Sequence, residues 1–466
     1  MWWSRLKWSI YLAYHLRGQT RFPFEPLEVI QRAQARRVQS MIAYAYHRVP
    51  YYRRVMDNLG LSPGDFRTAE DLSRLPILER KHLQQNPEDL VSTAQPRDYY
   101  LKLRTGRSTH THGTVYHDAT SLFQNAAHGE RERSMIVKLV GRSLGYRETS
   151  IATSSGVAKE VHKFCQKHGF LPKGIRIQRQ YLPLDPPEKN VPLINEFKPD
   201  VLHSYGSYLE VLFPYLYTTG VPFHRPKIVT YSSDGLSNPV RRLITETFGL
   251  PLLSTYQATE AFKIGFECFY NMGLHLNIDL YPVRIVNEKG ETLPDGESGD
   301  VILSNLVNRA TVLLNYRLGD IACILPGPCP CGRSLPRLSL PQARSDDWIQ
   351  LTSGRLIHPM RVKDVFLVEE ELWQYQIVQE SGTHFRIALV ASGTCNRQAM
   401  AQRITHNLNR ILGEDITINL TFTDQIPRTP GGKVRTVLSL RQKPQGETIF
   451  DGIRSYQPYE LDEAIS

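Results

Sequence analysis

The chain has 466 residues, of which 41% are hydrophobic and 22% are charged, and its net charge is +10. This length exceeds one ordinary hydrophobic core, so we expect two or three domains, and the composition excludes a disordered chain. No stretch reaches the roughly 18–20 uninterrupted apolar residues of a membrane-spanning helix, which excludes that class of protein too.

The amino-terminal segment MWWSRLKWSIYLAYHLR mixes aromatic and aliphatic residues with Arg5, Lys7 and Arg17. Residues 1–60 hold ten Lys/Arg against three Asp/Glu, a net +7. The segment lacks the apolar core and small-residue cleavage site of a signal peptide. Either it lies on an anionic membrane surface, or it is a helix packed on the protein with its basic face in water. No nucleic-acid reader motif accompanies the charge, so nucleic acid is not an expected partner.

Six cysteines in a chain of this length do not form a disulfide framework. They indicate a reducing compartment. We therefore expect a cytoplasmic protein, with membrane association through the amino terminus as the alternative.

Apolar residues at helical spacing run through residues 27–57, with a break at Pro50, and again near Ala69–Arg74. From about residue 100 to residue 340, short apolar runs alternate with helical patterns, which predicts an α/β fold with largely parallel sheets. A helix is expected over 237–248 and a hairpin turn over 288–291. The expected strands are Ser150–Thr153, Val201–His203, Lys227–Ser232, Leu252–Thr255 and Asp300–Leu303.

The pattern changes around residues 341–347. Beyond it, strand-like runs at Phe385–Val390 and Ile416–Phe422 flank a helical pattern over Arg397–Leu412, which predicts a small α+β domain. We place the large domain at 1–344, with a helical region over 1–100, and the small domain at 345–466.

The most informative motif is IPRTPGGKVR over residues 426–435. Paired glycines allow a tight turn that presents Lys433 into a cleft, where its charge can meet a phosphate or carboxylate. Taken alone, the same motif describes a solvated basic loop.

Three further motifs precede it: YQATE over 256–260, YRLGD over 316–320 and ARSDD over 343–347. Their order and spacing resemble the adenylate-forming ligases, and among them the phenylacetate–CoA ligase and capsule-gene (CapK-like) family. The resemblance extends from about residue 30 to about residue 445. It implies a large domain with mixed and parallel sheets flanked by helices, and a small mobile carboxy-terminal domain.

The resemblance also implies a reaction. A carboxylic acid attacks the α-phosphorus of ATP, pyrophosphate leaves, and the acyl group passes to CoA or to another thiol, amine or hydroxyl acceptor. Some relatives transfer AMP itself, so the acceptor stays open. Such chemistry depends on positioning and charge neutralisation.

The resemblance assigns roles to residues in these motifs. Lys433 would neutralise charge during adenylation, and Glu260 would hold Mg²⁺, a hard cation that suits a carboxylate. Tyr256 would stack on adenine and Thr259 would contact the nucleotide. The family usually has glycine where Gln257 stands.

Three more positions complete the nucleotide site implied by the family. Asp320 would accept two hydrogen bonds from the ribose, and Asp234 falls where the family contacts adenine. Arg344, together with Asp346, falls at the hinge between the domains.

The phosphate loop departs from the family pattern. Gly106 and Ser108 fit the expected Ser/Thr/Gly-rich loop, but Arg107, Thr109 and Thr111 replace a small hydroxyl residue, a glycine and a proline. Either side chains replace the backbone N–H groups as phosphate ligands, or ATP chemistry is impaired. The alternative function is therefore a degenerate or repurposed family member, non-catalytic or transferring AMP, and membrane-peripheral in polysaccharide or lipid assembly.

A metal site is the last candidate. Cys329 and Cys331, with Cys268 and His275 earlier in the chain, supply three thiolates and an imidazole, a closed tetrahedral set for structural zinc. Buried thiols are the alternative, and the family resemblance favours zinc.

The acid pocket would be lined from residues 202–208 and 153–156. These residues are polar and aromatic, which favours an aryl or small polar acid over a long fatty chain. His203 fits a substrate contact and a satisfied strand-end histidine equally well.

Overall fold

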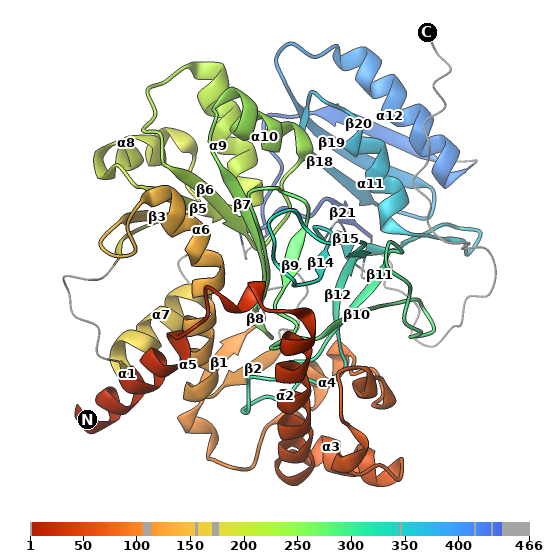
Figure 1. The fold of residues 1–466 in the computed structure, drawn as a ribbon. Helices are drawn as coiled ribbons and strands as arrows, with labels where there is room; N and C mark the ends of the chain where they lie inside the picture. The colour runs from red at the N-terminus through yellow and green to blue at the C-terminus, as the bar shows by residue number, and fades with distance from the viewer. Residues whose placement is uncertain are drawn as a thin grey trace.

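The computed structural model describes residues 2–105, 113–153, 157–169, 177–341, 343–344, 347–413, 416–429 and 432–439. Figure 1 shows helices around several sheets, with the carboxy-terminal elements gathered at one end. The helices of the described residues are α1 (Trp2–Leu16), α2 (Leu27–Arg48), α3 (Pro50–Asn58), α4 (Arg80–Gln85), α5 (Ala119–His128), α6 (Glu130–Val140), α7 (Val157–His168), α8 (Pro187–Phe197), α9 (Gly206–Thr219), α10 (Asn238–Arg242), α11 (Pro359–Leu367) and α12 (Arg397–Leu412).

A nine-stranded sheet forms the centre of the large domain. Its parallel part, β7-β6-β5-β3-β4, continues through β8 and β9 into antiparallel pairing. In spatial order its strands are β13 (Ile324–Leu325), β14 (Arg337–Leu338), β9 (Leu274–Leu276), β8 (Phe262–Glu267), β7 (Leu252–Ala258), β6 (Ile228–Ser232), β5 (Val201–Tyr205), β3 (Arg147–Ile151) and β4 (Gln178–Leu182).

The two faces of this sheet are covered differently. Ile151, Leu202 and Val229 pack with α8, α9 and α10 on one face. On the other face Val201 and Ile228 share a core with Met135 of α6. Successive side chains of each strand therefore enter different cores on the two faces, as expected for a sheet covered by helices on both sides.

Smaller sheets complete the large domain. The antiparallel sheet contains β10 (Val283–Val286), β11 (Gly299–Leu303), β12 (Tyr316–Ala322) and β15 (Ala343–Arg344) in that order. In this domain β1 (Leu101–Arg104) pairs with β2 (Thr114–His117). The other two-stranded pair, β16 (Ile349–Gln350) with β17 (Leu356–Ile357), belongs to the carboxy-terminal segment, whose core includes Ile349 and Ile357.

The carboxy-terminal segment has its own four-stranded sheet and its own core. Helices α11 and α12 pack on this sheet, and residues such as Phe385, Ile387 and Ile404 are fully buried between them. Residues 345 and 346 lie outside the described residues, so the proposed boundary stays a prediction. The strands, in order, are β20 (Thr417–Phe422), β19 (His384–Ala391), β18 (Leu372–Gln379) and β21 (Val437–Leu438).

The predicted elements are confirmed with small shifts. Helix α12 has the predicted limits, and the break at Pro50 separates α2 from α3. The strand predicted at 150–153 is displaced, because β3 covers Arg147–Ile151. The helix predicted over 237–248 is shorter than expected, since α10 ends at Arg242 and continues as a π-helical turn over Leu243–Thr247.

The amino-terminal helix α1 packs against α5 and α7 (Figure 1). Trp8 stacks on Phe123 with ring centroids 5.1 Å apart, and Gln124 donates to the Tyr11 hydroxyl at 2.5 Å. These contacts place α1 on the body of the protein. None of the described helices is long and apolar enough to cross a membrane.

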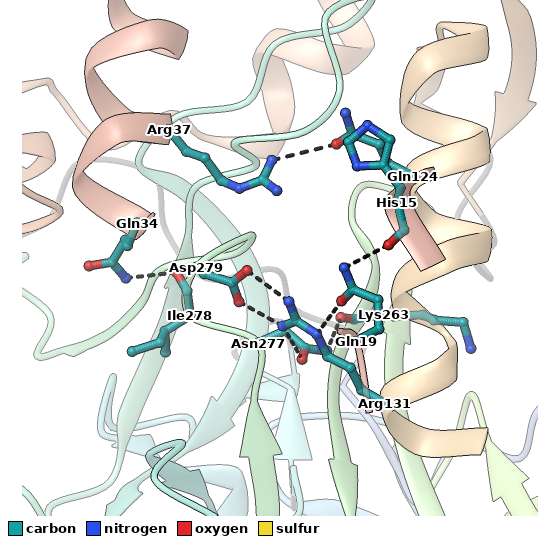
Figure 2. Close-up of polar contacts among 10 residues, drawn as sticks. All are labelled: His15, Gln19, Gln34, Arg37, Gln124, Arg131, Lys263, Asn277, Ile278 and Asp279. Atoms are coloured by element: carbon teal, nitrogen blue, oxygen red, sulfur yellow. Dashed lines mark hydrogen bonds and ion pairs between the residues drawn. The ribbon is translucent and has the colours of Figure 1, made fainter. Parts of the chain in front are cut away.

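A buried ion pair ties this region to the central sheet. Figure 2 shows the Arg131 guanidinium donating to both oxygens of Asp279, at 2.7 and 2.9 Å, with each side chain 2% exposed. Arg131 also donates to Gln19, which follows α1, and to Asn277. Because a buried charge is costly unless it is paired, this network fixes the chain after α1 against the β9 end of the sheet.

Candidate functional site

A cavity of about 1950 Å³ lies at the carboxyl ends of the central parallel strands. Parallel α/β sheets bind ligands at this edge. Residues of the carboxy-terminal segment, including Lys363 and Lys433, line the same cavity as Tyr256 and Asp320 of the large domain. The cavity therefore lies where the two parts of the chain meet.

Asp234 follows β6 and accepts hydrogen bonds from the backbone N–H of Ser207, at 3.2 Å, and from its hydroxyl, at 2.5 Å. The strand and helix approach closely here, since a Cβ on Gly206 would lie 2.1 Å from the carbonyl oxygen of Gly235. Only glycine fits that position. Burial raises the pKa of Asp234, and the Ser207 hydroxyl and the nearby Lys433 ammonium oppose that rise.

Tyr256 and Asp320 meet across the cavity. The Tyr256 hydroxyl donates to the Asp320 carboxylate at 2.7 Å. Burial, followed by the Asp320 charge, raises the pKa of Tyr256 well above its usual value, so the phenol stays protonated. Gly319 has a φ of +85°, a left-handed conformation that glycine adopts without strain. Tyr256 thus orients the carboxylate that sequence analysis assigned to ribose.

Glu260 and Thr259 follow β7 at the same edge of the sheet, and both line the cavity. Glu260 is 5% exposed, and its carbonyl accepts from the Asn305 amide at 2.8 Å. The Thr259 carbonyl accepts from Nε2 of buried His117 at 2.9 Å. Burial lowers the pKa of His117 to about 4, so this ring is neutral. The backbone of the 259–260 turn is therefore held at both residues.

Lys433 lies in a tight turn that the small domain presents to the cavity. The Thr429 backbone N–H donates to the Lys433 carbonyl at 2.8 Å. Gly432 has a φ of +80°, and a Cβ there would lie 2.4 Å from Leu184 and 2.7 Å from Thr153. Glycine is thus required where the turn inserts against the large domain.

Arg428 fastens this turn to the large domain. Its guanidinium donates to the hydroxyl of Ser207 at 2.7 Å and to the carbonyl of Ser207 at 2.8 Å. Because Ser207 also donates to Asp234, the turn that carries Lys433 is linked directly to the nucleotide-site candidate Asp234. Arg428 lies within the motif over 426–435, but the sequence alone assigned it no role.

Sequence analysis also missed Lys363, Asp347 and Arg435. Lys363 comes from α11, and burial lowers its pKa to about 8, with Asp347 and Asp320 opposing that fall. Arg435 forms an ion pair with Asp347. All three line the cavity. Their signal in the sequence was weak, because a lysine on an amphipathic helix ordinarily lies in solvent.

Some predicted positions cannot be compared with the structure. Gly106 and Ser108 of the phosphate loop lie outside the described residues, and so does Asp346. Next to the loop, the Thr105 hydroxyl accepts from Arg80 at 2.9 Å and from the Gly113 backbone at 3.1 Å. The backbone of Arg344 pairs with Asp320 between β15 and β12.

The four candidate zinc ligands come together. Their ligand atoms all lie within 4.8 Å of one another. The Cys268 and Cys329 sulfurs are 3.6 Å apart, and the Cys331 sulfur is 3.3 Å from Nε2 of His275. Zn–S bonds of about 2.3 Å in a tetrahedron put two sulfurs about 3.8 Å apart, so the donor set fits zinc. Burial lowers the pKa of His275 to about 4, which leaves the neutral imidazole that metals bind.

Comparison with known proteins agrees with the motif resemblance. Residues 349–439 match the family model of the CapK C-terminal domain. The phenylacetate–coenzyme A ligase of Thermus thermophilus is 25% identical over 90% of this chain and 98% of its own length. The resemblance to phenylacetate–CoA ligases and CapK proteins is confirmed.

The fold is that of adenylate-forming CoA ligases. A crystal structure of 2-hydroxyisobutyryl-CoA ligase in the postadenylation state matches with a TM-score of 0.68 at 19% identity, over 90% of this chain and 91% of that one. The same ligase in the thioesterification state, with CoA, matches with a TM-score of 0.59 over 89% of this chain and 90% of that one, also at 19% identity.

Proposed function

We propose that this protein is an ATP-dependent acid–thiol ligase. A carboxylate oxygen of the acid attacks the α-phosphorus of ATP, the bond to the β-phosphate breaks, and pyrophosphate leaves. A thiol, CoA being the first choice, then attacks the acyl carbon and releases AMP. The match to a protein named phenylacetate–coenzyme A ligase spans nearly the whole length of that protein, which supports the assignment.

The observation that carries the proposal is the convergence of Asp234, Tyr256, Asp320 and Lys433 on one cavity. These residues come from separate parts of the chain. Together they provide two carboxylates that accept hydrogen bonds from a nucleoside and a lysine whose charge suits a phosphate. Asp320, oriented by Tyr256, would accept hydrogen bonds from the ribose hydroxyls, and Asp234 would contact the base. Lys433 would offset the negative charge that gathers when carboxylate and phosphate meet.

Mg²⁺ would be held by Glu260, whose carboxylate lines the cavity and belongs to the hard oxygen donors that this ion prefers. The ion supplies charge neutralisation at the phosphates when bound. The hydrogen bonds to the carbonyls of residues 259 and 260 fix the turn from which this carboxylate projects.

Movement of the small domain would separate the two half-reactions. Hydrogen bonds join it to α9 and α10: Gln374 donates to the Ser207 carbonyl at 3.1 Å, and Ser237 donates to the Trp373 carbonyl at 3.0 Å. Trp373 also packs against the apolar core around these helices. Interfaces between domains of one chain commonly contain such polar contacts and allow relative motion of the domains. We place the hinge at Arg344 and Asp346.

The Cys268, His275, Cys329 and Cys331 cluster would hold a structural zinc ion. All four positions of a tetrahedral ion are filled by protein, so no position stays open for chemistry. The ion would join the β8–β9 hairpin to the loop after β13.

Substitution of Asp320 tests the nucleotide site. Asp320→Asn keeps the size of the side chain but removes its charge, so ATP affinity should fall at least about tenfold. Acid-dependent pyrophosphate release, over a panel of aryl, amino and short-chain acids, should fall with it. Asp295→Asn, in an exposed turn, is the matched control. Unchanged ATP affinity in Asp320→Asn would contradict the proposed site.

The outer face of α1 favours a second role, contact with an anionic membrane surface. Trp3, Ile10 and Tyr14 are 77%, 62% and 68% exposed. Lys7 lies between Trp3 and Ile10 along the helix, Arg17 directly follows its last residue, and the first 24 residues contain no acidic side chain. Exposed aromatic residues interleaved with cations are typical of interfacial helices.

A further inference from the structure

The cavity extends from the nucleotide-site candidates along one face of the central sheet. Register places Ser150, His203 and Thr230 side by side on neighbouring strands, with their side chains on the same face. Ser232 lies one step closer to the carboxyl edge, two residues before Asp234. We name this part of the cavity the polar chamber after its polar lining residues, Ser150, His203, Thr230, Ser232, Glu132 and Lys263. Leu253 and Tyr181, the register neighbours of Thr230 and Ser150, line the cavity beside them.

The floor of the polar chamber is hydrogen-bonded through His203. Its Nδ1 lies 3.0 Å from the Thr230 hydroxyl, and its Nε2 lies 3.4 Å from the Ser232 hydroxyl. Burial lowers the pKa of His203, so the ring is neutral at physiological pH and offers one donor and one acceptor. Both ring nitrogens are thus used within the floor, and the Thr230 and Ser232 hydroxyls, which can each donate and accept, carry its remaining hydrogen-bonding capacity.

The lining of the chamber also contains an ion pair. Lys263 of β8 pairs with Glu132 of α6, and the two side chains are only 23% and 16% exposed. Figure 2 shows the Lys263 carbonyl held by the Asn277 amide, which belongs to the Arg131–Asp279 network. The base of Lys263 is thus fixed to a buried network, and its ammonium lines the chamber together with the Glu132 carboxylate.

An apolar ligand does not suit this chamber. Although Lys263 pairs with Glu132 and His203 bonds the two hydroxyls, these contacts do not use every donor of the ammonium, every acceptor site of the carboxylate or both roles of each hydroxyl. A phenyl or alkyl group would remove water from these remaining sites without replacing its hydrogen bonds. A buried donor or acceptor left unsatisfied costs about 1–3 kcal/mol, and more where the group is charged. A ligand hydroxyl or amino group replaces those bonds.

We propose that the acid bears a hydroxyl or amino substituent that hydrogen-bonds in the polar chamber, in place of an unsubstituted aryl or alkyl group. This inference rests on the proposed function for the placement of the carboxylate beside Lys433. With the carboxylate there, the acyl group extends past Ser232 toward His203 and Thr230. The Glu132–Lys263 pair adds a charged donor and a charged acceptor to the same lining.

Equilibrium binding of matched acids tests the proposal directly. Calorimetry, with a non-cleavable ATP analogue present, compares phenylacetate with its hydroxyl and amino derivatives, and butyrate with hydroxybutyrate and aminobutyrate. At least one substituted acid should bind about tenfold or more tightly than its parent, because sites built for a polar group reject analogues that lack it.

Two variants locate the selectivity. Thr230→Val removes the chamber hydroxyl and should reduce the preference severalfold. Thr149→Val makes the same change on the opposite face of the sheet, where the hydroxyl donates to Gln180 at 2.8 Å, and should leave the preference unchanged. Because the readout is a ratio between two acids, a general loss of folded protein does not mimic the result.

Equal binding within each pair, tighter binding of the parent acids, or no binding of any acid would overturn the proposal. So would a preference that persists in Thr230→Val. Selective acid binding without pyrophosphate release would leave this inference standing and overturn the proposed ligase activity instead.

Discussion

Loss of one zinc ligand should destabilise the large domain, and Cys329→Ser is the sharpest test. Cys329 is 5% exposed, and its sulfur lies 3.6 Å from the sulfur of Cys268. A serine at this position is too short to complete the tetrahedral set of zinc ligands. Structural zinc sites contribute apparent free energies of about 10–16 kcal/mol. Losing one of four ligands should therefore cost at least about 3 kcal/mol, which lowers Tm by roughly 5–10 °C in a domain of this size.

Cys323→Ser provides a matched control. Cys323 is half-buried and lies in the same region of the chain, but it is not a member of the cluster. Elemental analysis should find about one zinc per chain in the wild type and in Cys323→Ser, and little in Cys329→Ser. Differential scanning calorimetry measures the three Tm values. A metal-free wild type, or equal Tm values for the two variants, would refute the zinc assignment.

Three further predictions concern the cavity and the amino terminus. Tyr256→Phe removes the donor to Asp320, and since bonds to charged groups contribute about 1.5–3 kcal/mol, KM for ATP should rise about tenfold; an unchanged KM would contradict the orienting role. Burial raises the pKa of Glu210 from 4.5 to about 8, so the folded protein holds a proton there that the unfolded chain releases; stability should fall as pH rises from about 4.5 to about 8. Glu210→Gln should remove that fall and raise Tm at pH 8, because the free energy of unfolding there rises by a few kcal/mol at most. An identical pH dependence of Tm in the wild type and the variant would contradict the assigned role of Glu210. Deleting residues 1–20 should reduce co-sedimentation with anionic vesicles; equal co-sedimentation would exclude α1 as the membrane contact.

Much of the fold could be predicted because its signals are local. The pattern over Arg397–Leu412 gave the limits of α12, and the break at Pro50 separates two helices because proline cannot continue the hydrogen-bonding of the first. Limits were poorer where tertiary packing decides them. β7 extends to Ala258, past the predicted Thr255, because β8 pairs with it up to that residue.

The candidate site also contains residues that local motifs predict and residues whose roles depend on long-range contacts. Asp320 and Lys433 could be proposed from motifs, since both stand beside glycines that the turns require. The roles of Arg428 and Lys363 depend on contacts between the two parts of the chain, which no local pattern records. The hydrogen bonds from Arg428 to Ser207 join residues more than two hundred positions apart.

The lining of the polar chamber likewise could not be predicted from local patterns. His203 and Thr230 lie on separate strands, and only the register of β5 on β6 makes them neighbours. The partner of Lys263 comes from α6, far earlier in the chain. Sequence analysis could state that the pocket is polar and aromatic, but the pairing of opposite charges on its wall is a property of the fold.

The most direct test of the ligase assignment is single-turnover pyrophosphate release from Mg·ATP by Lys433→Ala, with an acid selected from the panel. Lys189→Ala, an exposed lysine on α8, is the matched control. We predict acid-dependent release in the wild type and in the control, and release at least roughly tenfold slower in Lys433→Ala with ATP affinity retained, because Lys433 meets charge that develops in the transition state. Release at the wild-type rate in Lys433→Ala, or a loss of ATP affinity as large as the loss of rate, would contradict this account.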